Sequence, residues 1–255
     1  MSVWQALILG AVQGITEFLP VSSSGHILLV GRLLGVRAGM LFEVMMYVGT
    51  LLAVVIVFRK ELLELFRPPL TRLLLLLLAT LPAGIAGVLL SDAIDRVFGG
   101  GEWLFLTFAA SAALVVLTRH VLLRREARGM LGRRTDLGIA AAMGFAQAAA
   151  LLPGLSRSGT VICAGTAAGG EAKDVTAFAF LMSIPVIAGS AILGACGGLT
   201  GGEGALQTAV GCAAAFATGV LSARFMKKGV GGRAGGLLAA YLTGLSLLSL
   251  TLELL

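Results

Sequence analysis

The chain has 255 residues, of which 58% are hydrophobic and 13% are charged, and its mean hydropathy is +0.99. Soluble domains are less apolar than this, and several runs approach the roughly 18–20 residues that a helix needs to cross a bilayer. The net charge of +6 is spread over short loops between apolar runs, which indicates membrane topology rather than a nucleic-acid partner. The composition excludes a soluble domain and predicts a polytopic membrane protein.

Ten apolar segments follow one another in two sets of five. In each set the first two segments are too short to span a bilayer separately, and they meet at a break that contains Pro, Ser and Gly. In lipid, such a break leaves backbone groups without partners, so it must be buried in protein or line a wet cavity. We predict that each set forms a re-entrant hairpin of two half-helices followed by three transmembrane helices. The predicted segments are hairpin 3–34 with spans 41–58, 70–90 and 103–123, and hairpin 137–168 with spans 175–198, 205–227 and 235–254.

The two sets define two repeats, 1–123 and 137–255, joined by a basic cytoplasmic linker at 124–136. Three crossings are an odd number, so the second repeat must be inverted relative to the first, as in many transporter folds. The predicted fold is therefore all-α and integral to the membrane, with two inverted-topology repeats.

The basic residues test this topology independently, because cytoplasmic loops carry an excess of Lys and Arg. If the first hairpin opens to one side, the loops on the opposite side carry 15 of the 19 basic residues, and Arg157 lies inside the second hairpin. We therefore expect both termini to face outward and the site to open to the outer side. The 15 residues are Arg59, Lys60, Arg67, Arg72, Arg119, Arg124, Arg125, Arg128, Arg133, Arg134, Lys173, Arg224, Lys227, Lys228 and Arg233, and the other three are Arg32, Arg37 and Arg96.

Two short polar tracts lie at the predicted breaks and resemble each other. They are Pro20–His26, which reads PVSSSGH, and Pro153–Thr160, which reads PGLSRSGT. A glutamine precedes each tract, Gln13 and Gln147, at a separation of 134 positions. Hydroxyl, imidazole and guanidinium groups are costly to bury in lipid and by default mark a functional site. The duplication suggests two copies of one hairpin that face each other.

Gln13 and Glu17 are four residues apart and therefore share one face of the first half-helix. Gln13 fits either a hydrogen bond to a neighbouring helix or a place in the site. Glu17 is an ionisable carboxylate three residues before the break. It can serve as a general acid, orient a base, or help to hold a divalent cation against a phosphate.

Ser22, Ser23, Ser24 and Gly25 open the second half-helix of the first hairpin. One serine is expected to cap the helix, but three hydroxyls exceed what a cap requires. The free backbone N–H groups and the helix dipole make such an N-terminus an anion site. His26 follows Ser23 by about one turn, and this pair can activate a nucleophile or protonate a leaving group.

Arg157 lies just past the second break, between Ser156 and Ser158. A permanently charged guanidinium in a membrane requires an anionic partner, and its planar fork suits phosphate or carboxylate. The partner is either a phosphorylated ligand or, in a purely structural role, Glu17 or Glu43. Glu43 begins the first full span, where a solvated carboxylate and a functional one are both compatible with the sequence.

These motifs together carry a family resemblance that covers the whole chain in order and length. Gln13-x-x-x-Glu17, the tracts 20–26 and 153–159, and Phe42–Val44 resemble those of the undecaprenyl-pyrophosphate phosphatases of the bacitracin-resistance type. The resemblance implies an inner-membrane enzyme that removes the terminal phosphate of undecaprenyl diphosphate. The product is the monophosphate carrier lipid of peptidoglycan synthesis, and a divalent cation, Mg²⁺ or Ca²⁺, is associated with activity.

By motif position, the resemblance implies that Glu17 is a catalytic acid, Ser23 the nucleophilic serine, His26 the essential histidine and Arg157 the phosphate-binding arginine. Glu17 and Gln13 are the implied cation ligands. Further substrate-binding candidates are Ser22, Ser24, Gly25, Ser156, Ser158, Gly159 and Thr160, and Glu43 is another possible site residue.

The chain departs from the family pattern at three places. Gln13 stands where many members have glutamate, Thr160 and Val161 follow the second motif where a small residue and then threonine are usual, and Tyr47 replaces a commoner glutamine or histidine. The sequence leaves open whether Ser23 or His26 is the nucleophile, with the other group as phosphate ligand or base.

The rival class is a transporter or flippase for a phosphorylated polyprenyl lipid or a small anion, since broken helices in inverted repeats are typical of transporters. Transport needs Arg157 and the helix ends but has little use for clustered Glu17, Ser23 and His26. A structural membrane subunit would leave every buried polar group unexplained. Membrane lipids are expected partners, and a homo-oligomer stays open.

Overall fold

The computed structural model describes residues 1–196, 203–228 and 233–254. Throughout these ranges the regular structure is helical, apart from one isolated bridge between Arg133 and Gly170. The helices are α1 (Val3–Phe18), α2 (Ser23–Leu34), α3 (Met40–Val57), α4 (Arg59–Glu64), α5 (Thr71–Phe98), α6 (Leu104–Ala127), α7 (Leu137–Ala149), α8 (Arg157–Ala167), α9 (Ala172–Cys196), α10 (Ala205–Lys227) and α11 (Arg233–Leu254).

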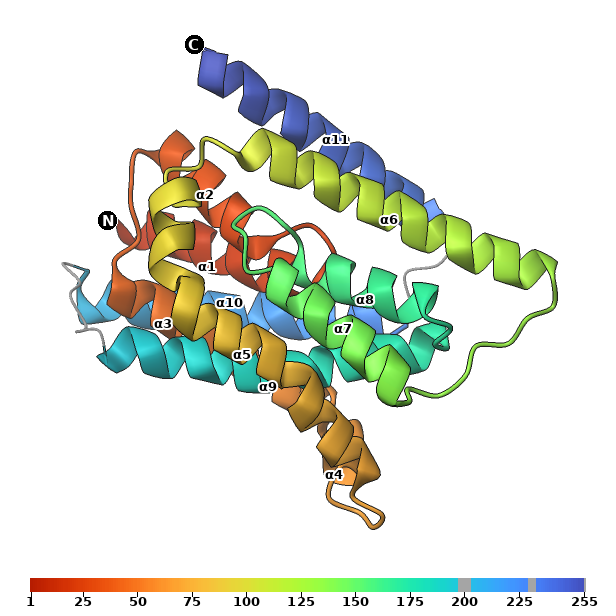
Figure 1. The fold of residues 1–255 in the computed structure, drawn as a ribbon. Coiled ribbons are helices and arrows are strands. Elements are labelled where there is room, and N and C mark those ends of the chain that lie inside the picture. Colours follow the sequence, from red (N-terminus) through yellow and green to blue (C-terminus); the bar gives the residue numbers. More distant parts are fainter. Residues whose placement is uncertain (197–202, 229–232, 255) are drawn as a thin grey trace.

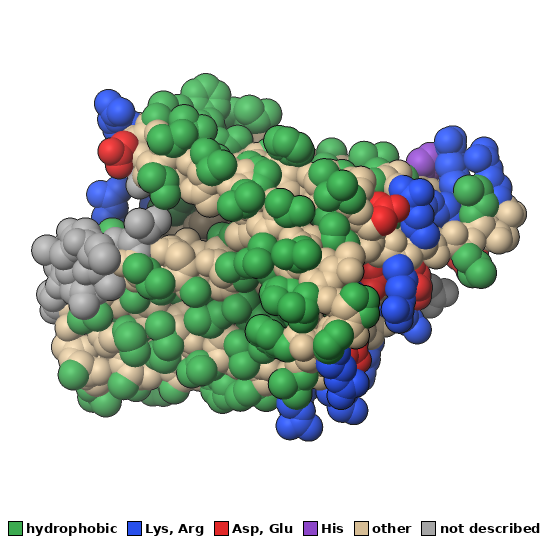
Figure 2. Space-filling view, turned by 60° about the horizontal axis from the view of Figure 1, so that its bottom comes forward, with side chains coloured by type: hydrophobic (Ala, Val, Ile, Leu, Met, Phe, Trp, Pro, Cys, Tyr) green, Lys and Arg blue, Asp and Glu red, His purple; other side chains and the backbone are tan. Residues whose placement is uncertain are grey.

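Six of these helices are long and apolar enough to cross a membrane, namely α3, α5, α6, α9, α10 and α11. They fall at the six predicted spans, so the expectation of an all-α, multi-pass membrane protein is confirmed. Large apolar side chains such as Leu89 and Leu237 are more than 70% exposed, as expected of surfaces that face lipid tails. Hydrophobic side chains are spread over the face in Figure 2, and Lys and Arg gather mainly toward one end of it.

Some helices extend into segments that the sequence predicts to be loops. Helix α5 continues to Phe98 rather than ending near residue 90, and α6 continues to Ala127, inside the expected linker. A short helix, α4, forms in the expected loop at 59–69. Charged residues in these segments end the apolar run without ending the helix, so hydropathy alone sets the boundary too early.

The loops of one end of the bundle are held together by charged contacts. Arg72 at the start of α5 pairs with Asp174 at the start of α9 (2.6 Å), and Asp174 also accepts hydrogen bonds from Thr135. Lys227 at the end of α10 pairs with Glu61 of α4 (2.7 Å). We call this the basic end of the molecule.

Different contacts join the opposite end, which we call the N-terminal end. The backbone N–H of Gly39 donates to Glu203 (2.8 Å), and Gln207 donates to the carbonyl of Met1 (3.4 Å). The hairpin of α1 and α2 therefore opens to the N-terminal end, whereas the hairpin of α7 and α8 opens to the basic end. The two turns meet in the middle of the bundle (Figure 1).

The two hairpins pack against the long helices in a reciprocal way. Helix α1 packs on α10 and α7 packs on α5, while α3 contacts α9 and α6 contacts α11. A Cβ atom on Gly10 would lie 2.2 Å from the carbonyl oxygen of Gly211, and one on Gly144 would lie 2.5 Å from that of Ala79. Glycine is thus required at both crossings for the backbones to approach. This close packing fixes the hairpin tips.

Candidate active site

The tips of the two hairpins contact each other directly. Ser24 of α2 accepts a hydrogen bond from the backbone N–H of Gly154 (3.4 Å), and Ser158 of α8 donates to the carbonyl of Leu19 (3.0 Å). Gly154 has φ +86, a conformation that favours glycine. A Cβ atom on Gly25 would lie 2.9 Å from the Cα atom of Gly154. The break at Pro20 is therefore buried in protein, whereas Pro153 at the second break is half-buried and lines a cavity; these are the two alternatives predicted for such a break.

Both half-helices begin with a serine cap. Ser22 accepts from the N–H of Gly25 (3.3 Å), and Ser156 accepts from the N–H of Gly159 (3.1 Å). Thr160 donates its hydroxyl to the carbonyl of Ser156 (2.7 Å) and so turns back into its own helix. The expected capping role of one serine is confirmed, and the N–H groups of the two glycines are not free for a ligand.

The first two N–H groups of each half-helix are left without partners. Within the described residues, the backbone N–H groups of Ser23, Ser24, Arg157 and Ser158 donate no hydrogen bond. All four lie at helix N-termini, where orphan donors and the helix dipole favour an anion. The predicted anion site thus has donors in both hairpins.

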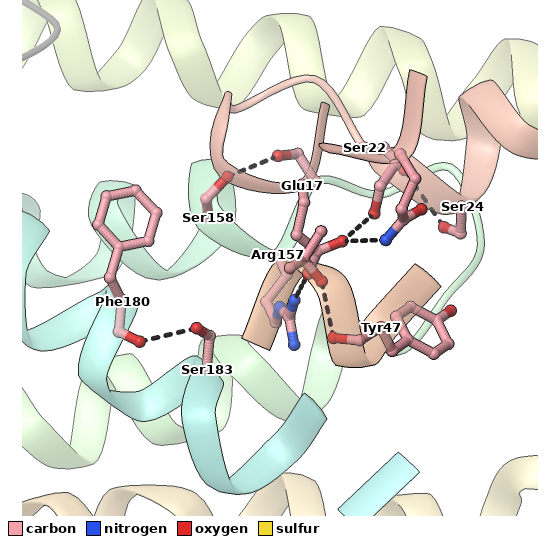
Figure 3. A network of polar contacts seen from close by, with 12 residues as sticks. Glu17, Ser22, Ser24, Tyr47, Arg157, Ser158, Phe180 and Ser183 are labelled. Atoms are coloured by element: carbon pink, nitrogen blue, oxygen red, sulfur yellow. Dashed lines mark hydrogen bonds and ion pairs between the residues drawn. The ribbon is translucent and has the colours of Figure 1, made fainter. Parts of the chain in front are cut away.

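Glu17 stands at the centre of the polar network (Figure 3). Its Oε1 atom pairs with the guanidinium of Arg157, and its Oε2 atom accepts from Ser23 (2.6 Å) and from the amide of Gln13 (2.9 Å). The Glu17 side chain is 1% exposed, whereas that of Arg157 is 24% exposed. The buried carboxylate is therefore fully hydrogen-bonded, and the guanidinium remains within reach of a ligand.

The ion pair identifies the protein partner of Arg157. Of the two carboxylates considered from the sequence, it is Glu17 that meets the guanidinium. Breaking a buried pair by removing one partner is costly because it leaves an uncompensated charge. An anion with more negative charge than a carboxylate, such as a phosphate, can compete for the same fork of donors.

A cavity of about 1400 Å³ contains this network and extends to the N-terminal end. Ser22, Ser23 and Ser24 line it from the first hairpin, and Arg157 and Ser158 from the second. The site candidate Glu43 also lines it, from α3, together with Tyr47 of the same helix. Its remaining walls are largely apolar. The shape is that of a site for a molecule with a polar group deep inside and apolar parts around it.

Gln147 is a cavity residue that sequence reasoning missed. Its side chain lies in the wall of the cavity, the residue is 1% exposed, and neither atom of its amide has a hydrogen-bond partner in the described structure. Buried amides are nearly always hydrogen-bonded, so an unpaired amide in a cavity wall indicates a missing partner such as a water molecule or a ligand. The recurrence of Gln13 as Gln147 was the signal that could have identified it.

His26 faces away from the carboxylate network. Its Nδ1 atom lies 2.6 Å from the carbonyl of Ser22, and its Nε2 atom lies 2.8 Å from the hydroxyl of Tyr241 on α11. A carbonyl only accepts, so Nδ1 carries a hydrogen and Tyr241 donates to Nε2 in the neutral ring. The ring also packs edge-on to Phe108. The structure pairs Ser23 with Glu17, not with His26, and Tyr241 is a second residue that the sequence did not reveal.

The donors around Glu17 make only a partial cation site. No group of three or more His, Cys, Asp and Glu side chains suited to a metal occurs in the described part of the chain. Glu17 supplies one carboxylate and Gln13 one amide oxygen. Mg²⁺ is commonly bound by one or two carboxylates together with substrate phosphates. The two donors Glu17 and Gln13 fit this kind of site.

The fold and this site define a class of protein. A buried acid–hydroxyl pair, an arginine and two helix N-termini meet inside a helical membrane protein, which is the equipment of an intramembrane enzyme for a phosphorylated, lipid-like molecule. The family model described as bacitracin resistance protein BacA matches residues 6–248. The chain belongs to this family, and the resemblance read from the motifs is confirmed.

Relatives of known name agree with this assignment. An undecaprenyl-diphosphatase of Rubrobacter xylanophilus is 40% identical, with 88% of this chain and 89% of the relative covered. One of Methanosphaera stadtmanae is 31% identical over 99% of both chains. One of Carboxydothermus hydrogenoformans is 38% identical over 76% of this chain and 73% of the relative.

Proposed function

We propose that this chain is a membrane phosphatase that hydrolyses undecaprenyl diphosphate to undecaprenyl phosphate and inorganic phosphate. The observation that carries the proposal is the contact of Ser23 with Glu17 beside Arg157, in a cavity bounded by two helix N-termini. The names of the relatives supply the substrate. The polyprenyl chain would lie along the apolar walls and in the bilayer, with its diphosphate at the hairpin tips.

Binding of the diphosphate is assigned to the second hairpin and the free N–H groups. Arg157 and the N–H groups of Ser23, Ser24 and Ser158 surround the non-bridging oxygens of the terminal phosphate. Phosphoryl transfer depends mainly on positioning and on charge stabilisation of this kind.

The nucleophile in this mechanism is Ser23. Its hydroxyl proton already points to Glu17 at 2.6 Å, which is the geometry of a nucleophile and its general base. The serine oxygen forms a bond to the terminal phosphorus, the bond from that phosphorus to the bridging oxygen breaks, and the lipid phosphate leaves. Water then attacks the phosphoserine, and inorganic phosphate is released with Ser23 regenerated. His26 has a supporting role through Ser22, whose carbonyl it contacts.

A divalent cation remains part of the proposal. We propose that Glu17 and Gln13 would hold a Mg²⁺ or Ca²⁺ ion when the diphosphate is bound. Such an ion would neutralise phosphate charge. The roles of Ser23 and Arg157 above hold whether or not it is present.

We further propose that the two halves are inverted repeats in a plasma membrane, with the basic end in the cytoplasm. The reciprocal packing of α1 on α10 and α7 on α5, and the opening of the hairpins to opposite ends, support the inversion. A cysteine introduced at Gly100 should be labelled from outside, and one introduced at Gly129 should not. Reversed labelling would contradict the orientation.

The function is tested by phosphate release from undecaprenyl diphosphate, measured with the protein purified in detergent. The wild-type protein should release one phosphate per lipid and leave the monophosphate intact, and Ser23→Ala should release none. Thr208→Ala is the matched control and should retain the wild-type rate. It removes a buried hydroxyl that donates to the carbonyl of Gly204, the residue before α10. Movement of the intact diphosphate lipid across vesicles without release of phosphate would favour the transporter instead.

A further inference from the structure

A second cavity, of about 360 Å³, lies on the other side of the hairpin tips. Gly159, Ile162 and Thr166 of α8 form one wall, and Val115 and Thr118 of α6 form another. We call it the basic-end pocket, because it reaches from the first hairpin's Pro20 to Lys173 and Lys228. Gly159 and Thr166 are seven positions apart, which corresponds to about 10 Å along α8.

The basic-end pocket is built from helix surfaces that correspond to those of the large cavity, each in the opposite half of the chain. The glutamines and the polar tracts recur at a separation of 134 positions, and this separation also relates wall residues of the two cavities. Four pairs illustrate it, with the large-cavity member first: Leu28 and Ile162, Arg32 and Thr166, Ser249 and Val115, and Leu252 and Thr118. The fold thus repeats, toward the basic end, the wall that we assign to a lipid substrate.

The two cavities differ in charge. The large cavity is lined by Glu17, Glu43 and Asp92 as well as by arginines. No acidic residue lines the described part of the basic-end pocket, whereas Arg119, Lys173 and Lys228 do, and both lysines are exposed. Neither lysine has an ion-pair partner in the described ranges of the chain. Apolar pocket walls next to two lysines match a ligand that has an acyl chain and an anionic head group.

We propose that the basic-end pocket binds an anionic phospholipid of the adjacent leaflet. Its phosphate lies between Lys173 and Lys228, and part of one acyl chain packs along Ile162 and Val115. Basic pockets between transmembrane helices at the cytoplasmic face recognise lipid headgroups in this way. The identity of the leaflet rests on the proposed topology, but binding itself does not rest on the proposed phosphatase activity.

The test is lipid retention by the purified full-length protein, measured by native mass spectrometry after exchange into micelles with equal phosphatidylglycerol and phosphatidylcholine. The wild-type protein should retain phosphatidylglycerol preferentially. The double variant Lys173→Gln, Lys228→Gln should lower that retention about tenfold or more, because each lysine near a membrane surface adds to the affinity for anionic lipid. Lys60→Gln, at an exposed site in α4, should retain it fully. Equal retention in the double variant and the control would overturn the proposal.

A second variant separates the pocket from surface charge. Thr118→Phe keeps both lysines and fills the space between α6 and α8, so it should also lose phosphatidylglycerol, with size exclusion and phosphate release reporting that it is folded. Retention of the lipid by a folded Thr118→Phe protein would overturn the pocket as its location. Displacement of phosphatidylglycerol by millimolar inorganic phosphate, or stronger retention of undecaprenyl phosphate, would overturn a phospholipid as the occupant.

Discussion

The two hairpins begin their second half-helices alike but with different chemistry at the first position. Ser22 and Ser156 cap them through the same side-chain bond, to the N–H group three residues on. The next residue is Ser23 in the first hairpin and Arg157 in the second. The Glu17 position of the first hairpin corresponds to Leu151 in the second, 134 residues later. The shared frame therefore positions both tips. In the proposed mechanism the first hairpin supplies the base and the nucleophile, and the second hairpin supplies the positive charge.

The same comparison explains the unpaired amide. Gln13 donates to Glu17 (2.9 Å), but the corresponding neighbour of Gln147 is the apolar Leu151. Gln147 therefore keeps its buried position and loses its protein partner. A group freed in this way in a cavity wall is available to substrate.

Outside the nucleophile Ser23, the largest effect is expected at Arg157. Arg157→Ala should lower kcat/KM by on the order of 10²-fold or more, about 2.7 kcal/mol of transition-state stabilisation, as when a preorganised donor is removed. Arg157→Lys should lose most activity because it lacks the planar fork. Phosphate release measures both variants, and Arg96→Ala, an exposed arginine that bonds within α5, is the control. A normal rate with poor stability in detergent would make Arg157 a structural ion-pair member only.

A smaller loss is expected at Gln147. Gln147→Leu should lower kcat/KM by about tenfold, the value of one or two hydrogen bonds to a charged ligand. It should not destabilise the protein, because an apolar side chain of similar size replaces an unsatisfied amide. Gln207→Leu, which removes an amide at the N-terminal end, is the matched control. Unchanged kinetics with raised thermal stability would show that Gln147 does not meet substrate.

The smallest effect is expected at Tyr241, which acts only through His26. Tyr241→Phe removes the donor to Nε2 and should lower the rate by about threefold, roughly one neutral hydrogen bond. In a His26→Ala background the same change should have no effect, since residues of one network are not additive. Equal losses of rate in the wild-type and His26→Ala backgrounds would show that Tyr241 does not act by positioning the His26 ring.

Hydropathy and the two breaks were sufficient to predict the spans, because length and apolarity are what the bilayer demands. The site was predicted less completely. Ser23 and His26 are one turn apart, yet the bond of Nδ1 to the Ser22 carbonyl turns the ring toward α6 and α11. Tyr241 belongs to a helix far along the chain, and nothing local links it to the motif. Contacts between distant helices decide these orientations, and a pattern within one segment does not contain them.

The proposed roles of the two hairpins, attack by the first and phosphate binding by the second, are tested most directly by measuring binding and turnover separately. The probe is a methylene-bridged analogue of undecaprenyl diphosphate that cannot be hydrolysed, with Kd measured for Ser23→Ala and Arg157→Ala. We expect Ser23→Ala to abolish turnover with Kd within about threefold of wild type, because it removes the attacking oxygen and little binding surface. Arg157→Ala should weaken binding by about tenfold or more, through loss of a charge-assisted bidentate contact. Near-normal turnover in Ser23→Ala, or unchanged binding in Arg157→Ala, would contradict the account.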